Sequence, residues 1–260
     1  MYKMVVSSFS NTLIDNEEAI PCSTMIEIDR LRRENGVFFT IMTDNPLNLV
    51  IDYNRDFPFI DYIVAFNGGY VYDVLNRKMI TKKSIGVSII KKIYRLFSDL
   101  NICFYTLEYG AYWGSYLEKH YSFKINDFSS FLDSHRLDVY KIAIICDNKL
   151  QVRRVLKSID DYEVNVDTKI VEKDGKIFVE LYSKMNDKLN GIMKIAKLNK
   201  IKLDDVLAIV CSDSDINIAK SVAKSICVSN GSSKMKKYCK EETLSNDDKG
   251  VEAVLKKYFI

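Results

Sequence analysis

Histidine, proline and glycine are scarce in this sequence, and each shortage excludes something. The 260 residues include 2 His, 3 Pro and 10 Gly. Flexible or extended linkers are rich in proline or glycine, so we expect no long low-complexity segment. The two histidines, His120 and His135, lie in the middle of the chain, so a histidine base is not expected near either end.

The six cysteines have no CxxC pair and no close metal-ligand spacing. Three of them, Cys103, Cys146 and Cys227, have apolar neighbours, where a free cysteine behaves as a small hydrophobe. No apolar run approaches the roughly 18 residues of a membrane-spanning helix. The start of the chain also lacks an apolar stretch long enough for a signal peptide. We therefore expect a reduced, cytoplasmic protein that does not bind membranes.

Charge is almost balanced, since 38 Lys and Arg face 35 Asp and Glu for a formal net charge of +3. The densest basic stretch, Lys234 to Lys240, is short. A nucleic-acid-binding surface needs a focused basic face, so we expect no nucleic-acid partner. The hydrophobic content of 47% and charged content of 28% are typical of a soluble globular protein.

The two ends of the chain show the pattern of an α/β fold. Short apolar runs alternate with segments of helical spacing, which predicts βαβ units and a parallel sheet. We expect strands over 2–7, 37–42, 62–66, 206–211 and 225–228, and helices over 23–36, 47–53, 189–198, 215–223 and 250–258.

The middle of the chain differs, because its helices alternate with hairpin strands. Lys173-Asp174-Gly175-Lys176 is a turn signal between two predicted strands. We expect helices over 87–100 and 149–159 and strands over 102–107, 139–145, 169–172 and 177–182. The sequence thus predicts one domain from 1–82 and 183–260, with a small α+β domain inserted at 83–182.

Polar turns follow three of the predicted strands, at 8–12, 43–45 and 211–215. In open parallel sheets, ligands bind outside the carboxyl ends of the strands. We therefore expect these turns to share a pocket, although topology alone does not identify its ligand.

These turns resemble, in order and spacing, the motifs of the haloacid dehalogenase superfamily, and of its Cof-like phosphatase branch. Where the family has Asp-x-Asp-Gly-Thr-Leu, this chain has Ser8-Phe9-Ser10-Asn11-Thr12-Leu13. The family's Thr-Gly-Arg and Gly-Asp-x-x-Asn-Asp correspond to Thr43-Asp44-Asn45 and to 210–215. Its motif-three lysine corresponds to Lys188. The resemblance spans the chain and implies a Rossmann-like core, with parallel sheet, and an inserted α+β cap.

The resemblance also implies what the substitutions remove. In the family, the first Asp attacks phosphorus and the second acts as general acid and base. Here those positions are Ser8 and Ser10, and Cys211 replaces an Asp that holds Mg²⁺. A thiol is a poor ligand for this hard ion, so Asp213 and Asp215 would bind Mg²⁺ only weakly, and no cofactor is expected to be required.

The residues that correspond to the family's phosphate-binding set remain, namely Thr12, Thr43, Lys188 and Asn230. With fewer carboxylates, the pocket should accept phosphate more easily. We therefore favour a catalytically silent homologue, a pseudoenzyme, that binds a phosphorylated small molecule or a protein partner. Two alternatives are a weakly active Mg²⁺-dependent phosphomonoester (sugar phosphate) hydrolase that uses non-standard carboxylates, and an interaction protein with a vestigial pocket.

Each of these residues also has a purely structural interpretation. Ser8 and Ser10 suit a polar turn, Thr43 and Asp215 could cap helices, and Cys211 could simply fill space. The aromatic cluster of the inserted domain suits either a substrate lid or a core. Its members are Tyr105, Tyr109, Tyr112, Trp113, Tyr116 and Tyr121.

Overall fold

The computed structural model describes residues 1–53, 58–107, 110–115, 122–133, 138–173, 175–184 and 186–259. They divide into two compact units. Unit 1 comprises Met1–Lys82 and Asp187–Ile260, and unit 2 comprises Lys83–Asn186. The second strand of a hairpin in unit 2 runs to Ser183, so this unit extends beyond residue 182.

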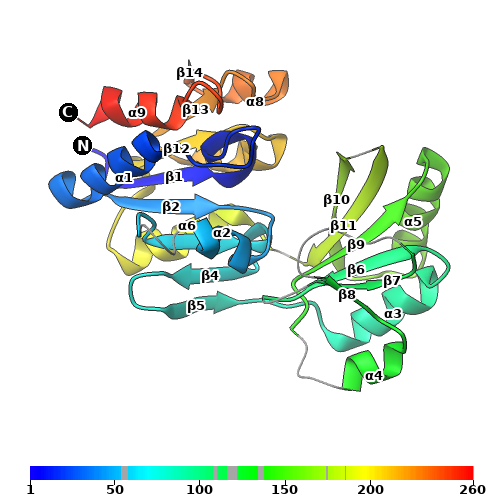
Figure 1. The fold of residues 1–260 in the computed structure, drawn as a ribbon. Helices are drawn as coiled ribbons and strands as arrows, with labels where there is room; N and C mark the ends of the chain where they lie inside the picture. The colour runs from blue at the N-terminus through cyan, green and yellow to red at the C-terminus, as the bar shows by residue number, and fades with distance from the viewer. Residues whose placement is uncertain are drawn as a thin grey trace. The chain divides into compact units, whose positions relative to one another are not determined.

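Within the described residues, unit 1 contains a sheet of eight strands in the order β14-β13-β12-β1-β2-β3-β4-β5 (Figure 1). The strands from β14 to β3 pair in parallel, whereas β4 and β5 are antiparallel. This arrangement confirms the predicted α/β fold with a parallel sheet. The strands are β1 Met4–Ser8, β2 Phe38–Met42, β3 Tyr62–Ala65, β4 Tyr70–Asp73, β5 Lys78–Lys82, β12 Val206–Val210, β13 Lys224–Val228 and β14 Glu241–Thr243.

Helices cover both faces of this sheet. One face packs on α6 and α7 through Ile192, Ile195 and Ile218, which form one buried cluster with Met4 and Val6. On the other side, α1 lies against α9 (Figure 1). The helices are α1 Cys22–Asn35, α2 Leu47–Tyr53, α6 Lys188–Leu198, α7 Ile216–Ser221, α8 Ser233–Tyr238 and α9 Gly250–Tyr258.

Within the described residues, unit 2 contains helices and a sheet of strands in the order β10-β11-β9-β6-β7-β8. Neighbouring strands in this sheet are antiparallel, except for β7 and β8, which form a parallel pair at one edge. Its core is a buried hydrophobic cluster that includes Phe97, Phe104 and Ile144. The hairpin between β10 and β11 forms where the turn signal predicted it, with Gly175 at φ +71°. The elements are α3 Val87–Phe97, β6 Asn101–Tyr105, β7 Gly110–Trp113, β8 Ser122–Lys124, α4 Phe128–Asp133, β9 Lys141–Cys146, α5 Lys149–Asp161, β10 Val166–Lys173 and β11 Lys176–Ser183.

The aromatic cluster predicted for the inserted domain lies partly in this core. Trp113 packs edge-on against Tyr94, with ring centroids 4.9 Å apart, and its Nε1 donates to the carbonyl of Ser98 at 2.8 Å. Tyr105 is buried. The core interpretation therefore holds for Trp113 and Tyr105. Tyr109, Tyr116 and Tyr121 lie outside the described residues.

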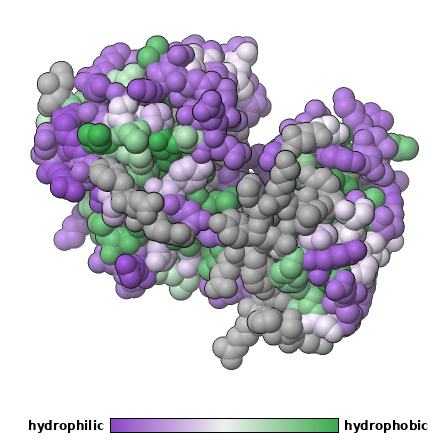
Figure 2. Space-filling model, viewed as in Figure 1, coloured by the Kyte–Doolittle hydropathy of each residue, from purple (hydrophilic) through white to green (hydrophobic). Residues whose placement is uncertain are grey.

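Hydrophilic side chains cover most of the surface in the view of Figure 2, around small groups of hydrophobic ones. Exposed large hydrophobic residues, such as Leu150 and Ile26, are spread over separate elements. In the described part of the chain, no helix is both long and apolar enough to cross a membrane.

Candidate functional site

The sheet of unit 1 brings the three polar turns together. Strand β1 lies between β2 and β12 and is parallel to both, so the turns after these strands share one edge. Ser8, at the end of β1, is paired in register with Met42, the last residue of β2. The turn after β12 continues into η4, a single 3-10 turn at Asp213–Asp215.

Asp215 is the centre of the site, because both of its carboxylate oxygens are held by partners from other elements. Ser8 Oγ donates to Asp215 Oδ2 at 2.7 Å, and Lys188 Nζ donates to Oδ1 at 2.9 Å. The Asp215 side chain is 1% exposed and that of Lys188 is 5% exposed. Although Asp215 precedes α7, its side chain makes no capping hydrogen bond, so the capping interpretation is wrong for this residue.

Lys188 contacts a second carboxylate. Its Nζ lies 3.3 Å from Asp44 Oδ1, in the turn after β2, and 3.3 Å from Ser214 Oγ. Burial opposes the charge on Lys188, but the attraction of Asp215 and Asp44 outweighs it and raises the pKa of the lysine above its ordinary value. Lys188 is therefore a stable cation and not a base. Asp44 directly follows Thr43 in the polar turn at 43–45 and is one of the carboxylates that a weakly active hydrolase could use.

A close backbone approach fixes the position of Lys188. Gly68 follows β3 with φ +90°, and a Cβ added there would lie 2.3 Å from the carbonyl oxygen of Asp187. Asp187 is the N-cap of α6, and its side chain accepts from the Leu189 N–H at 2.9 Å. Only glycine permits this contact without a shift of the backbone, so Gly68 is a packing requirement at the start of α6.

The hydroxyls of the first two turns have different surroundings. Thr43 Oγ1 accepts from the Asn45 N–H at 3.0 Å, and Asn45 Nδ2 donates to the exposed Ser10 Oγ at 3.2 Å. Thr12 is 1% exposed, and among the described residues its Oγ1 has no hydrogen-bond partner. Between Ser10 and Thr12, Asn11 adopts φ +55° at the position where the family motif has glycine. Asparagine tolerates this left-handed conformation better than most residues, so the turn is kept.

Three predicted site residues have partners elsewhere. Asp213 accepts from Ser232 Oγ and lies 3.7 Å from Lys234 Nζ, so it does not share the partners of Asp215. Asn230 connects two loops, since its Nδ2 donates to the Asn11 carbonyl and its Oδ1 accepts from the Asn246 N–H. Cys211 is half-buried, and its carbonyl accepts from the Ser232 N–H.

These donors do not fit a Mg²⁺ ion well. Mg²⁺ prefers carboxylate and water oxygens in an octahedral arrangement. Both oxygens of Asp215 are engaged by Ser8 and Lys188, and the carboxylate of Asp213 is engaged by Ser232. In the described part of the chain, no group of three or more His, Cys, Asp or Glu side chains could hold a metal ion.

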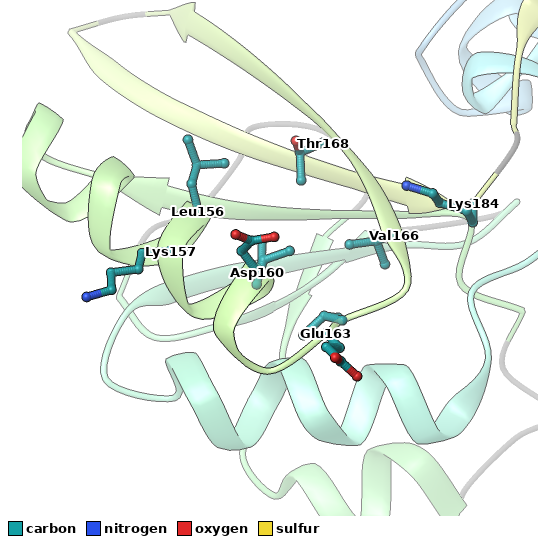
Figure 3. Close-up of a pocket in the computed structure, with 9 residues that line it drawn as sticks. Leu156, Lys157, Asp160, Glu163, Val166, Thr168 and Lys184 are labelled. Carbon is teal, nitrogen blue, oxygen red and sulfur yellow. The ribbon is translucent and has the colours of Figure 1, made fainter.

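A separate open pocket of about 600 Å³ lies in unit 2 (Figure 3). Figure 3 shows Asp160 on α5 and Thr168 on β10 at this pocket. Charges of both signs line it, and Lys184 pairs with Asp167 at 3.1 Å. The lining residues are Leu156, Lys157, Ile159, Asp160, Glu163, Val164, Val166, Thr168 and Lys184, and none of them belongs to the predicted site.

The comparison with protein families identifies the class. The model of the haloacid dehalogenase-like hydrolases matches residues 5–255, and the chain therefore belongs to this family. The sequence resemblance is confirmed at this level. No curated protein matches the sequence.

Solved structures agree with the fold. A haloacid dehalogenase-like hydrolase from Bacteroides thetaiotaomicron matches with 20% identity and a TM-score of 0.85, covering 100% of both chains. One from B. subtilis matches with 15% identity and a TM-score of 0.82, covering 99% of this chain and 100% of that one. A further Bacteroides thetaiotaomicron protein, described among phosphatases of the superfamily, has 15% identity and a TM-score of 0.80, covering 99% and 95%. At these identities the likeness shows the fold.

Proposed function

We propose that this protein is a catalytically silent haloacid dehalogenase-like homologue that binds a phosphorylated small molecule as a binding or regulatory protein. The observation that carries the proposal is the bond from Ser8 to Asp215, whose other oxygen is held by Lys188. The hydroxyl at the nucleophile position thus donates its hydrogen bond to a carboxylate that is also paired with a cation.

Among the described residues, the Ser8 hydroxyl donates to the Asp215 carboxylate and not to a histidine or a neutral amine. A serine must lose its proton to attack, and an adjacent base normally takes it. The Asp215 carboxylate that accepts from Ser8 is also paired with the Lys188 ammonium, and the raised pKa of Lys188 keeps that amine protonated. At the acid–base position Ser10 carries no charge, and loss of such a group alone costs about 100- to 10,000-fold in rate.

Two features support a retained anion site. Lys188 provides a buried positive charge at the carboxyl edge of the sheet. Thr43 Oγ1 accepts from the Asn45 N–H, and Thr12 has a buried hydroxyl without a partner among the described residues. Buried hydroxyls are normally satisfied, so a phosphate oxygen or water at Thr12 would remove an unfavourable feature.

The test is Mg²⁺-dependent phosphatase activity across a panel of phosphomonoesters, with Lys188→Ala purified identically to measure contaminating enzyme. We expect no turnover above this control. A titration with inorganic phosphate, followed by thermal unfolding, should stabilise the wild-type protein. Turnover that Lys188→Ala abolishes would overturn the proposal, and so would the absence of any response to phosphate.

A second candidate function is weak phosphomonoester hydrolysis with a substitute carboxylate. One observation favours it, since Asp44 lies 3.3 Å from Lys188, next to a residue of the phosphate-binding set. This hypothesis requires turnover that is lost in both Asp44→Asn and Lys188→Ala. Asp213, which pairs with Ser232 and Lys234, is the weaker substitute.

A further inference from the structure

Two asparagines hold the turn that carries Thr12, one on each side of it. Asn230 Nδ2 donates to the carbonyl of Asn11 at 2.9 Å, and Asn246 Nδ2 donates to the carbonyl of Ile14 at 3.0 Å. These carbonyls belong to the residue before Thr12 and to the second residue after it. We infer that Asn246, together with Asn230, is a positioning residue that places the Thr12 hydroxyl for a bound phosphate. This inference rests on the proposed function and deepens it.

Asn246 joins the loops around this turn. Its side chain is buried, and its backbone N–H donates to Asn230 Oδ1 at 3.1 Å, so the two asparagines are bonded directly. Its Nδ2 also lies 3.4 Å from Asn16 Oδ1. Buried amides are normally hydrogen-bonded, and truncation of this one would remove a donor from the Ile14 carbonyl.

The segment that carries Asn246 is itself well held. The Lys249 N–H donates to the carbonyl of Asn246 at 3.2 Å, and the Gly250 N–H donates to the carbonyl of Ser245 at 2.8 Å. Helix α9 begins at Gly250. Asn246 is therefore tied to the start of a helix, and from there its side chain can hold the turn after β1 in one position.

The turn after β1 needs this support for two reasons. Asn11 has φ +55°, a left-handed conformation that residues with a Cβ adopt reluctantly. Thr12 is 1% exposed, and its hydroxyl has no hydrogen-bond partner among the described residues. A hydrogen bond from this hydroxyl to a phosphate oxygen requires the two oxygens to lie about 2.5–3.0 Å apart. A small shift of the turn would therefore weaken the contact.

The same bonds give Asn230 a role that differs from the one implied by the family resemblance. Each end of its side-chain amide makes a hydrogen bond within unit 1, to the Asn11 carbonyl and from the Asn246 N–H. If Asn230 only bound phosphate directly, the Asn246 side chain would not affect affinity. If both asparagines position Thr12, loss of the Asn246 side chain weakens binding through that hydroxyl.

The experiment is a double-mutant cycle, measured by calorimetric titration of inorganic phosphate into wild type, Asn246→Ala, Thr12→Val and the double variant. Thr12→Val keeps the shape of the side chain, removes its hydroxyl and should weaken binding by about tenfold. Asn246→Ala should weaken it by about fivefold in wild type and by less than about twofold in Thr12→Val, where no hydroxyl remains to be positioned. Urea unfolding verifies that each variant is folded.

Asn16→Ala is the matched control. Asn16 Nδ2 donates to Asp247 Oδ2, so this variant removes a bond between the same two loops, outside the segment from 11 to 14. The control and the test variants are all uncharged replacements of uncharged residues, so the charge around the site is unchanged. We expect Asn16→Ala to change phosphate affinity by less than about twofold.

The outcomes separate the two proposals. Phosphate binding of equal affinity in wild type and Asn246→Ala overturns the inference and leaves the anion site intact. Equal weakening by Asn246→Ala in both backgrounds also overturns it, because the asparagine would then act independently of the Thr12 hydroxyl. The same holds if Asn16→Ala weakens binding as much as Asn246→Ala does. Absence of phosphate binding in wild type overturns the proposed anion site and the inference together.

Discussion

Ser8 Oγ donates a 2.7 Å hydrogen bond to Asp215 Oδ2, across 207 positions of the chain. The family resemblance implies an aspartate at the position of Ser8. In the family, a bound metal ion offsets the repulsion between that aspartate and the carboxylates of the fourth motif. A hydroxyl needs no such ion, because it donates directly to the carboxylate. With serine at this position, no cation is needed to offset repulsion between position 8 and Asp215. Among the described residues, Ser8, Lys188 and Ser214 all donate to the Asp215 carboxylate.

Ser8→Ala should destabilise the protein by about 2 kcal/mol, because it leaves a buried carboxylate oxygen without its donor. Ser10→Ala is the matched control, since Ser10 is exposed and, within the described ranges, its hydroxyl accepts one bond, from Asn45. We expect its free energy of unfolding to change by less than about 0.5 kcal/mol. Urea denaturation of both variants measures the difference, and equal effects would show that the Ser8 bond contributes nothing particular.

The sequence predicted the elements whose apolar residues form runs or repeat with helical spacing. The strand at β12 and the helix at α6 are of this kind, and both formed within one residue of the predicted bounds. The strands that it missed include β4, β7 and the edge strands β5, β8 and β14, and for β5 and β14 the physical reason is composition. Strand β14 is three residues with two glutamates, and β5 exposes Lys78, Met79 and Lys82. Such edge strands are fixed by pairing with a neighbour, which a single segment does not reveal.

For the site, the sequence predicted which turns meet but not where each side chain points. Asp213 and Asp215 are two residues apart, and the single turn η4 directs them to different partners. Asp213 accepts from Ser232 while Asp215 accepts from Ser8, so the two carboxylates have different partners. The contact of Asp44 with Lys188 could not be predicted from the sequence either, because it depends on the packing of α6 against β3.

Gly68→Ala should lower the free energy of unfolding by more than the replacement of a glycine with positive φ normally does. Gly36→Ala is the matched control in the same unit, since Gly36 has φ +63° and open space around an added Cβ. That variant should lose about 1 kcal/mol from backbone conformation alone. Gly68→Ala adds a clash with the carbonyl of Asp187 at 2.3 Å, and we expect a loss of about 3 kcal/mol or more.

Urea unfolding and phosphate titration of both glycine variants separate stability from the position of Lys188. Phosphate affinity should fall in Gly68→Ala, because the clash moves the start of α6. It should stay unchanged in Gly36→Ala. Equal losses of stability in the two variants would contradict the close approach of Gly68 to Asp187.

Glu241 predicts a pH dependence of stability. Hydrogen bonds from Lys224, Lys257 and Tyr258 lower the pKa of Glu241 to about 2. A lowered folded-state pKa gives stability that is present above the unfolded pKa of about 4.3 and is lost as the pH falls through about 2. The stability difference between wild type and Glu241→Gln should thus be largest near pH 7 and shrink between pH 4 and pH 2.

Urea midpoints of wild type and Glu241→Gln at several pH values measure this trend. Glu242→Gln is the neighbouring control, because Glu242 is more exposed and pairs with one cation, Lys236, at 2.9 Å. A difference for Glu241→Gln that stays constant from pH 7 to pH 2 would show that the lysines do not favour its charged form.

Restoring the missing carboxylates tests whether their loss alone accounts for the proposed lack of catalytic activity. In the triple variant Ser8→Asp, Ser10→Asp and Cys211→Asp, the nucleophile, the acid–base group and the metal ligand return to the positions that the family resemblance assigns. Without metal, the new carboxylate at position 8 would face Asp215 at the distance of a hydrogen bond and repel it. We therefore expect lower stability in chelator and a clear rise in melting temperature with Mg²⁺, which the wild type should not show.

Activity is the second measurement on this variant. Mg²⁺-dependent hydrolysis of phosphomonoesters should exceed that of the wild type by at least about 100-fold, the lower range for one acid–base group. The same triple variant with Lys188→Ala is the control, because it keeps the new carboxylates and removes the buried cation that holds Asp215. Mg²⁺ stabilisation without turnover would mean that the metal site returned but the geometry for attack did not. The loss of activity would then extend beyond these three substitutions, to the turn that carries Asp44 or to the positioning of the substrate.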